Sequence, residues 1–170
     1  MPTRPMPAPQ PASQPARASR GRGAHAARGA LIFGALAVLP FVWGAATQLL
    51  PGLADFGLRF LGPRFLGPYV GLGYGAVLLA TLSGVLLGFA LRAEAGARLA
   101  VIAMIPAAWA FLFTGGGPVS ASIWLGAGYL AALALDFSFW RNGVTPVWWL
   151  PLRVGQTAVI LTCLLVTAFF

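Results

Sequence analysis

The segment LIFGALAVLPFVWGAATQLL, residues Leu31–Leu50, contains no charged side chain. A helix needs about 20 mostly apolar residues to cross the hydrocarbon core of a bilayer. Four further apolar segments follow along the chain. We therefore predict an all-α integral membrane bundle of five transmembrane helices. The expected spans cover residues 30–50, 69–91, 99–114, 119–139 and 154–170.

The composition of the 170-residue chain agrees with a membrane protein. Apolar residues make up 59% and charged residues only 8%, whereas about 25% of the residues of a soluble protein are charged. Cys163 is the only cysteine and His25 the only histidine, so an intrachain disulfide and a Cys/His metal site are excluded. We expect no cofactor and no metal. The net charge of +8 would indicate a nucleic-acid partner in a soluble protein, but here we attribute it to membrane topology and expect no nucleic acid.

The N-terminal residues differ in composition from the rest of the chain. Residues 1–28 consist mainly of Pro, Ala, Ser, Gly and Arg, and proline disfavours both helix and sheet. Such a segment buries too little apolar surface to fold. We therefore predict a disordered cytoplasmic tail over residues 1–28, followed by a five-helix transmembrane domain over residues 29–170.

The distribution of arginine predicts the orientation. With the N-terminus inside, nine arginines lie in the tail and the inner turns, and only Arg59 and Arg64 lie outside. Positive residues concentrate on the cytoplasmic side, so we predict an N-terminus inside and a C-terminus outside. A cleaved signal peptide that ends within the first span is the alternative, and it would leave four spans. We favour an uncleaved span because the apolar run is longer than a signal peptide requires.

The connection after the first span has two interpretations. Residues 51–68, PGLADFGLRFLGPRFLGP, combine aromatic and basic residues. That mixture is typical of a segment lying among the lipid headgroups. The many Gly and Pro residues are equally consistent with an irregular loop.

Small residues in the second span predict helix packing. Gly71 and Gly75 form one small-xxx-small pair, and Gly84 and Gly88 form another on the nearly opposite face. Such pairs let helices approach closely in lipid. We expect packing within the chain on both faces, with dimerisation through one face as the alternative.

Asp136 is the only acidic residue within the five predicted spans. A charge in mid-membrane costs about 3 kcal/mol on the insertion scale, so Asp136 needs a partner. Arg141 and Arg153 are the candidates for an intramembrane ion pair, and we favour this structural role over a proton or substrate relay. Trp140, Trp148 and Trp149 lie near these charges and are predicted to be interfacial anchors. The chain has no recognisable catalytic motif, and we expect that it is not an enzyme.

Three segments resemble the DUF3429 family of membrane proteins of unknown function. They are LPFVWGAA at 39–46, YGAVLLATLSGVLLGFAL at 74–91 and LDFSFWRNGVTPVWWLPLRVGQT at 135–157. The sequence departs from the family pattern at Ser83 and Leu87. The matching positions are Pro40, Phe41, Tyr74, Gly75, Gly84, Gly88, Asp136, Pro146, Trp148 and Arg153. The resemblance implies a multi-pass protein of the bacterial inner (plasma) membrane and adds no chemistry.

The predicted function is that of a multi-pass membrane protein that serves as a non-enzymatic accessory or assembly component of a membrane complex. Its expected partners are the lipid bilayer and either another membrane protein or further copies of itself. The alternative is a small-solute or ion transporter or channel acting as an oligomer. A transporter needs polar residues along a path. The polar residues that could line such a path are Asp136, Thr81, Ser83, Gln48 and Tyr74.

Overall fold

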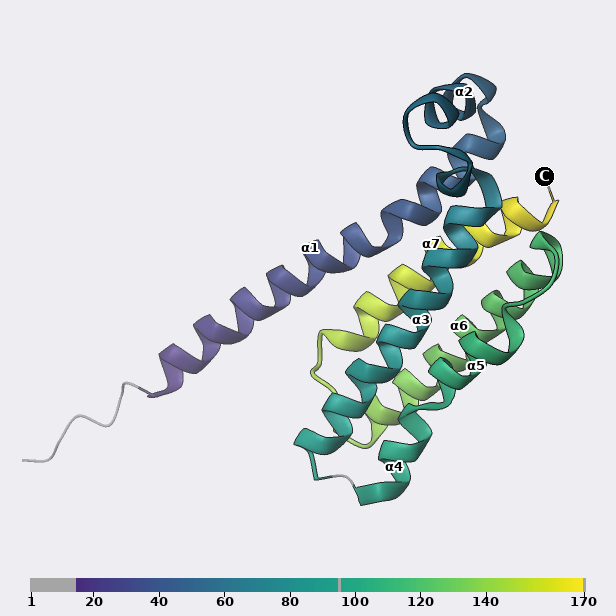
Figure 1. The fold of residues 1–170 in the computed structure, drawn as a ribbon. Coiled ribbons are helices and arrows are strands. Elements are labelled where there is room, and N and C mark those ends of the chain that lie inside the picture. Colours follow the sequence, from purple (N-terminus) through teal and green to yellow (C-terminus); the bar gives the residue numbers. More distant parts are fainter. Residues whose placement is uncertain (1–14, 95, 170) are drawn as a thin grey trace, which may run out of the picture.

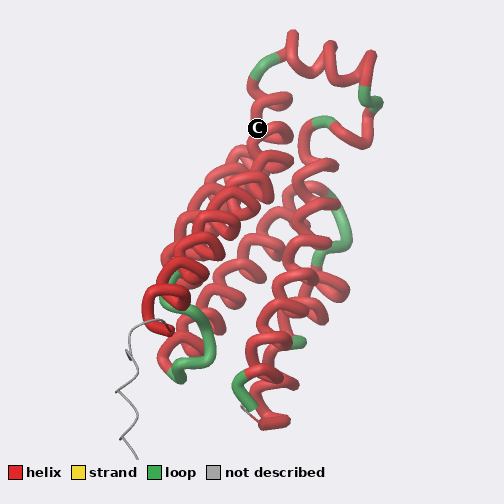
Figure 2. Tube along the Cα trace, turned by 90° about the vertical axis from the view of Figure 1, so that its left-hand side faces the viewer, coloured by secondary structure: helices red, strands yellow, loops and turns green. Residues whose placement is uncertain are grey.

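A computed structural model describes residues 15–94 and 96–169 of the chain. These residues form helices and short connections, without a β-strand among them. Five helical segments are long and apolar enough to cross a membrane: Gly29–Leu49, Gly67–Arg92, Gly96–Phe113, Pro118–Arg141 and Trp149–Phe169. The all-α prediction with five spans is therefore confirmed. Figure 1 shows the helices gathered into one elongated bundle, and Figure 2 shows the same bundle from its side.

The first helix, α1, extends from Pro15 to Leu49 and includes Pro40. It starts well before the predicted span of residues 30–50. Of the predicted tail, residues 1–14 lie outside the described residues, whereas the backbone of residues 15–28 belongs to α1. In Figure 1 the first turns of α1 project away from the other helices.

The connection after α1 is mostly helical, so the irregular-loop interpretation is wrong. Helix α2 covers Pro51–Phe60, and a 3-10 turn, η1, covers Pro63–Phe65. Proline suits the first turn of a helix, where the missing N–H has no intrahelical partner. The chain leaves α2 through Gly62, whose φ of 85° is a conformation that glycine adopts without steric cost. Both segments lie at one end of the bundle (Figure 1).

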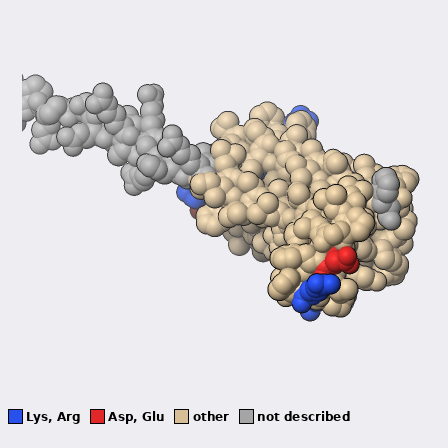
Figure 3. Space-filling model, turned by 90° about the horizontal axis from the view of Figure 1, so that it is seen from above, with Lys and Arg blue, Asp and Glu red and all other residues tan. Residues whose placement is uncertain are grey.

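Helix α3, Gly67–Arg92, lies between several neighbours and packs against α1, α5 (Ile105–Phe113) and α6 (Pro118–Arg141). It also contacts α4, Gly96–Ala103, and α7, Trp149–Phe169. The buried side chains Leu79, Leu125 and Ile160 bring α3, α6 and α7 together in the main core. Seen from the α2 end, most of the surface is uncharged, with a few basic and acidic side chains near its edge (Figure 3).

The predicted third span, residues 99–114, is divided into α4 and α5, Ile105–Phe113. The division falls at Met104 because Pro106 has no N–H to donate to the carbonyl four residues earlier. A side chain of another helix binds the backbone just after the division. Ala107 donates its backbone N–H to the hydroxyl of Ser83 on α3 at 2.7 Å. Such support from a neighbouring helix makes proline tolerable in a membrane span.

The last two helices differ from the predicted spans at the turn that joins them. Helix α6 covers Pro118–Arg141, and α7 begins at Trp149 rather than at residue 154. Arg153 is therefore inside a membrane-length helix and not in the connecting loop. Its charge is tolerated there because a carboxylate of α6 neutralises it.

Candidate functional site

The strongest concentration of buried polar groups lies between α6 and α7. Asp136 is on α6, while Trp149 and Arg153 are one turn apart on α7 and therefore share one face of that helix. Trp149 donates Nε1–H to Oδ1 of Asp136 at 2.7 Å. Arg153 donates Nε–H to Oδ2 at 2.8 Å. Each carboxylate oxygen thus accepts a hydrogen bond, and one of the donors carries a positive charge.

This ion pair is shielded from the surroundings of the bundle. The side chains of Asp136 and Arg153 are each 1% exposed. Burying two charges costs several kcal/mol per ion, and the attraction compensates only when geometry and hydrogen bonding are good. Both conditions hold for the carboxylate. The arrangement therefore fastens α6 to α7 at the end of the bundle where the two helices are joined.

The guanidinium of Arg153 extends the network to a third helix. Its Nη1 donates to Oε1 of Gln156 at 3.1 Å. Gln156 in turn donates Nε2–H to the backbone carbonyl of Gly34 on α1 at 3.0 Å. Gly34 permits this approach, since a Cβ there would lie 2.6 Å from Leu152 Cδ1. The polar network consequently connects α6, α7 and α1.

Two polar atoms near the ion pair have no hydrogen-bond partner among the described residues. They are Nη2 of Arg153 and Oγ1 of Thr157, which lies one turn further along α7. Both side chains are 1% exposed. A second buried hydroxyl, that of Tyr129 on α6, donates to the carbonyl of Gly75 on α3 at 2.9 Å. Buried polar groups therefore also lie outside the ion pair, at Thr157 on α7 and Tyr129 on α6.

The other predicted partner of Asp136 lies elsewhere. Arg141 is exposed at the end of α6 and makes no salt bridge with a residue that the structure describes. The separation follows from helix geometry. Arg141 is five residues beyond Asp136, and the Arg153 side chain occupies the carboxylate from α7.

Only part of the predicted tryptophan belt lies at the surface. Trp140 is 42% exposed, and Trp148 is partly buried. Trp149 is 8% exposed and belongs to the core, so its prediction as an interfacial anchor is wrong. Its indole N–H needs a partner when buried, and Asp136 supplies one. Trp149 also packs edge-on against Phe89 of α3, with ring centroids 5.1 Å apart.

The two glycine pairs of α3 have different environments. Gly71 and Gly75 are buried, and a Cβ at Gly75 would lie 2.6 Å from Leu125 Cδ2 and 3.1 Å from the Phe41 ring. Gly84 and Gly88 are exposed, with nothing within 4 Å of a built Cβ. The prediction that Gly84 and Gly88 pack within the chain is therefore wrong. The periodicity correctly placed them on the opposite face, but none of the described helices covers that part of the face.

Sequence reasoning missed three members of this region: Trp149 as a carboxylate donor, Gln156 and Tyr129. One signal could have found Trp149. Trp149, Arg153 and Thr157 recur every four residues and form a stripe on one helix face, provided that α7 is known to begin at Trp149. As for metal ligands, the described part of the chain contains no group of three or more His, Cys, Asp or Glu residues that could hold an ion.

Five helices of membrane-spanning length and apolar composition indicate a multi-pass α-helical membrane protein. The chain belongs to the family described as "Protein of unknown function (DUF3429)", whose sequence profile matches residues 26–169. The predicted family is thereby confirmed. Neither a curated protein nor a solved structure matches the chain.

Proposed function

We propose that this protein is a non-enzymatic accessory or assembly component of a membrane complex. The observation that carries the proposal is that the carboxylate of Asp136 is buried and already hydrogen-bonded. Both of its oxygens are occupied by Trp149 and Arg153, and its side chain is 1% exposed. A carboxylate that transfers protons or binds a substrate must be reachable, whereas a carboxylate that joins two helices need not be. The geometry thus favours a structural role for the ionic centre.

The uncovered face of α3 supports an assembly role. Gly84 and Gly88 are exposed and leave space where a side chain would otherwise project. In lipid, small residues spaced by four let another helix approach closely. We infer that this face is available to a helix of a partner protein. The lipid bilayer covers the other apolar surfaces.

The transporter alternative requires the available polar residues to share a path. Thr81 is exposed and donates to the Val77 carbonyl of its own helix at 2.8 Å. Ser83 binds the backbone of Ala107, and Gln48 binds Thr167 at 2.9 Å. None of these side chains contacts Asp136 through a hydrogen bond. One observation favours transport, namely the unpartnered Arg153 Nη2 and Thr157 Oγ1 in the core.

We also propose a location in the bacterial plasma membrane with the N-terminus in the cytoplasm. Because Arg153 is inside α7, it no longer counts among the loop arginines. Eight arginines then remain on the proposed inner side against Arg59 and Arg64 on the other. This bias still favours the same orientation under the positive-inside rule.

Affinity purification in mild detergent tests the assembly role. We expect one other membrane protein to co-purify in a fixed ratio with the unchanged chain. The double variant Gly84→Leu/Gly88→Leu should lose that protein. Gly155→Leu is the matched control, since Gly155 is also an exposed helical glycine with nothing within 4 Å of a built Cβ. Recovery of a lone monomer contradicts the proposal, and recovery of self-assemblies that carry a solute favours the alternative.

A further inference from the structure

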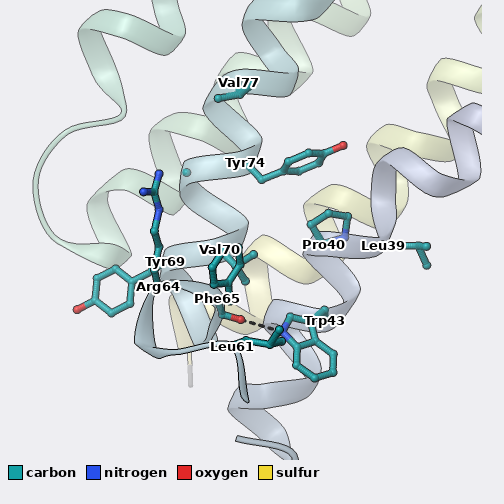
Figure 4. A pocket seen from close by; sticks show the side chains of 11 residues that line it. Leu39, Pro40, Trp43, Leu61, Arg64, Phe65, Tyr69, Val70, Tyr74 and Val77 are labelled. Atoms are coloured by element: carbon teal, nitrogen blue, oxygen red, sulfur yellow. Dashed lines mark hydrogen bonds between the residues drawn. The ribbon is translucent and has the colours of Figure 1, made fainter. Parts of the chain in front are cut away.

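A groove lies between α1 and α3, and neither Asp136 nor Arg153 is among its lining residues (Figure 4). Its volume is about 540 Å³, which is within the size range of small-molecule sites. Apolar residues of both helices form its walls. They include Leu39 and Pro40 on α1 and Val70, Gly73 and Val77 on α3.

The end of the groove nearest to α2 is held in place by hydrogen bonds. Trp43 donates Nε1–H to the carbonyl of Phe65 in η1 at 2.8 Å, the bond drawn in Figure 4. The backbone N–H of Gly67 donates to the hydroxyl of Thr47 at 2.9 Å. Both bonds tie the segment that carries η1 to α1. The groove is therefore part of the folded structure and does not depend on a ligand to form.

One cation lies at the rim of this apolar groove. Arg64 extends from η1 along α3 in the direction of Val77 (Figure 4). It makes no salt bridge within the part of the chain that the structure describes. An arginine at the edge of a membrane domain can place its guanidinium among the lipid headgroups. The planar guanidinium fits a phosphate group in particular, because it can donate two parallel hydrogen bonds.

The rim of the groove faces the surroundings of the bundle. Leu39 is 54% exposed, Val77 62% and Tyr69 63%. In a membrane protein these side chains contact lipid, so a ligand reaches the groove from the bilayer. Tyr69 and Trp43 add amphipathic rings of the kind that gather at headgroup level.

We propose that this groove binds one anionic phospholipid. Its phosphate lies at Arg64, and an acyl chain follows α3 past Gly73 and Val77. The apolar walls match the acyl chain, while the cation, which has no carboxylate partner among the described residues, matches the phosphate of a lipid whose headgroup carries no compensating positive charge. The proposal does not depend on an accessory or a transport role.

Native mass spectrometry of the full chain released from detergent tests whether the groove binds an anionic phospholipid. We expect one bound phosphatidylglycerol per chain and about tenfold weaker retention of zwitterionic phosphatidylcholine. Arg64→Gln should reduce the retention of phosphatidylglycerol by about tenfold, the size expected for one charge-assisted hydrogen bond. Arg59→Gln is the matched control because Arg59 is exposed on α2 and does not line the groove. We expect that it leaves retention unchanged.

Two variants test the apolar part of the groove. Gly73→Leu and Val77→Phe should each lower the retention of both lipids, because they fill the space for the acyl chain. Val77 is exposed, so its replacement is compatible with folding, and thermal unfolding checks both variants. Equal losses for Arg59→Gln and Arg64→Gln overturn the proposal, as does equal retention of the two lipids. Displacement of the lipid by inorganic phosphate alone also overturns it, because the site would then bind free phosphate.

Discussion

Arg153 of α7 donates its Nε–H to Oδ2 of Asp136 on α6 at 2.8 Å, and each side chain is only 1% exposed. This contact explains two features together. It neutralises the carboxylate of α6, and it lets α7 begin at Trp149 with an arginine inside its first turns. Each of the two charges makes the burial of the other tolerable.

Removal of the carboxylate charge should destabilise the bundle. Asp136→Asn leaves the Arg153 charge buried without its counter-ion, and breaking a buried pair in this way costs about 3–5 kcal/mol. We expect lower abundance in the membrane and a lower midpoint of thermal unfolding in detergent. Asp55→Asn is the control because Asp55 is exposed on α2. Normal abundance with loss of flux of one solute would refute the structural role.

Replacement of both charged partners should recover much of this loss. The variant Asp136→Leu/Arg153→Met removes the two charges together, and apolar replacements of buried ion pairs are often neutral or stabilising. We expect its unfolding midpoint to lie above that of Asp136→Asn. A midpoint as low as that of the single variant would show that the polar network does more than balance charge.

The two adjacent tryptophans should respond differently to substitution. Trp149→Phe removes the donor to Asp136 Oδ1 and should cost about 1–3 kcal/mol, since a buried acceptor loses its partner. Trp148→Phe should cost less because the indole N–H of Trp148 makes no hydrogen bond with a described residue, whereas that of Trp149 does. Thermal unfolding of the two variants, measured in the same detergent, provides the comparison. Equal losses would contradict the assignment of Trp149 as a carboxylate donor.

Glycine substitutions should distinguish the covered and uncovered faces. Gly75→Ala introduces a Cβ 2.6 Å from Leu125 Cδ2 in a fully buried core, and overpacking costs about 1–3 kcal/mol. Gly155→Ala places its Cβ in open space and should be neutral or stabilising, because alanine has the higher helix propensity. Unfolding midpoints test this order. A neutral Gly75→Ala would show that α1, α3 and α6 pack less tightly than described.

The proposed orientation predicts a labelling pattern. In a Cys163→Ala background, Arg92→Cys and Arg141→Cys should react with a membrane-impermeant thiol reagent only after the membrane is opened. Arg59→Cys should react in intact cells, because it lies on the opposite side. Arg59, Arg92 and Arg141 are all exposed. Reaction of positions 92 and 141 from opposite sides would exclude the five-span topology.

The number and approximate positions of the spans followed from hydropathy because the cost of exposing a backbone or a charge to lipid acts on each segment separately. The division at Met104 was missed, although Pro106 signals it, since tolerance of a proline depends on a neighbour such as Ser83. The start of α7 was missed for a similar reason. Arg153 looked like a loop residue as long as its partner was unknown.

Composition and pattern along the chain were sufficient for the class of protein, its family and the opposed glycine faces of α3. Three further points depended on how the helices pack. They are the choice of Arg153 over Arg141, the burial of Trp149, and the uncovered state of Gly84 and Gly88. The physical reason is that hydropathy and periodicity are properties of a single segment, whereas an ion pair, a covered face or a groove exists only where two helices meet.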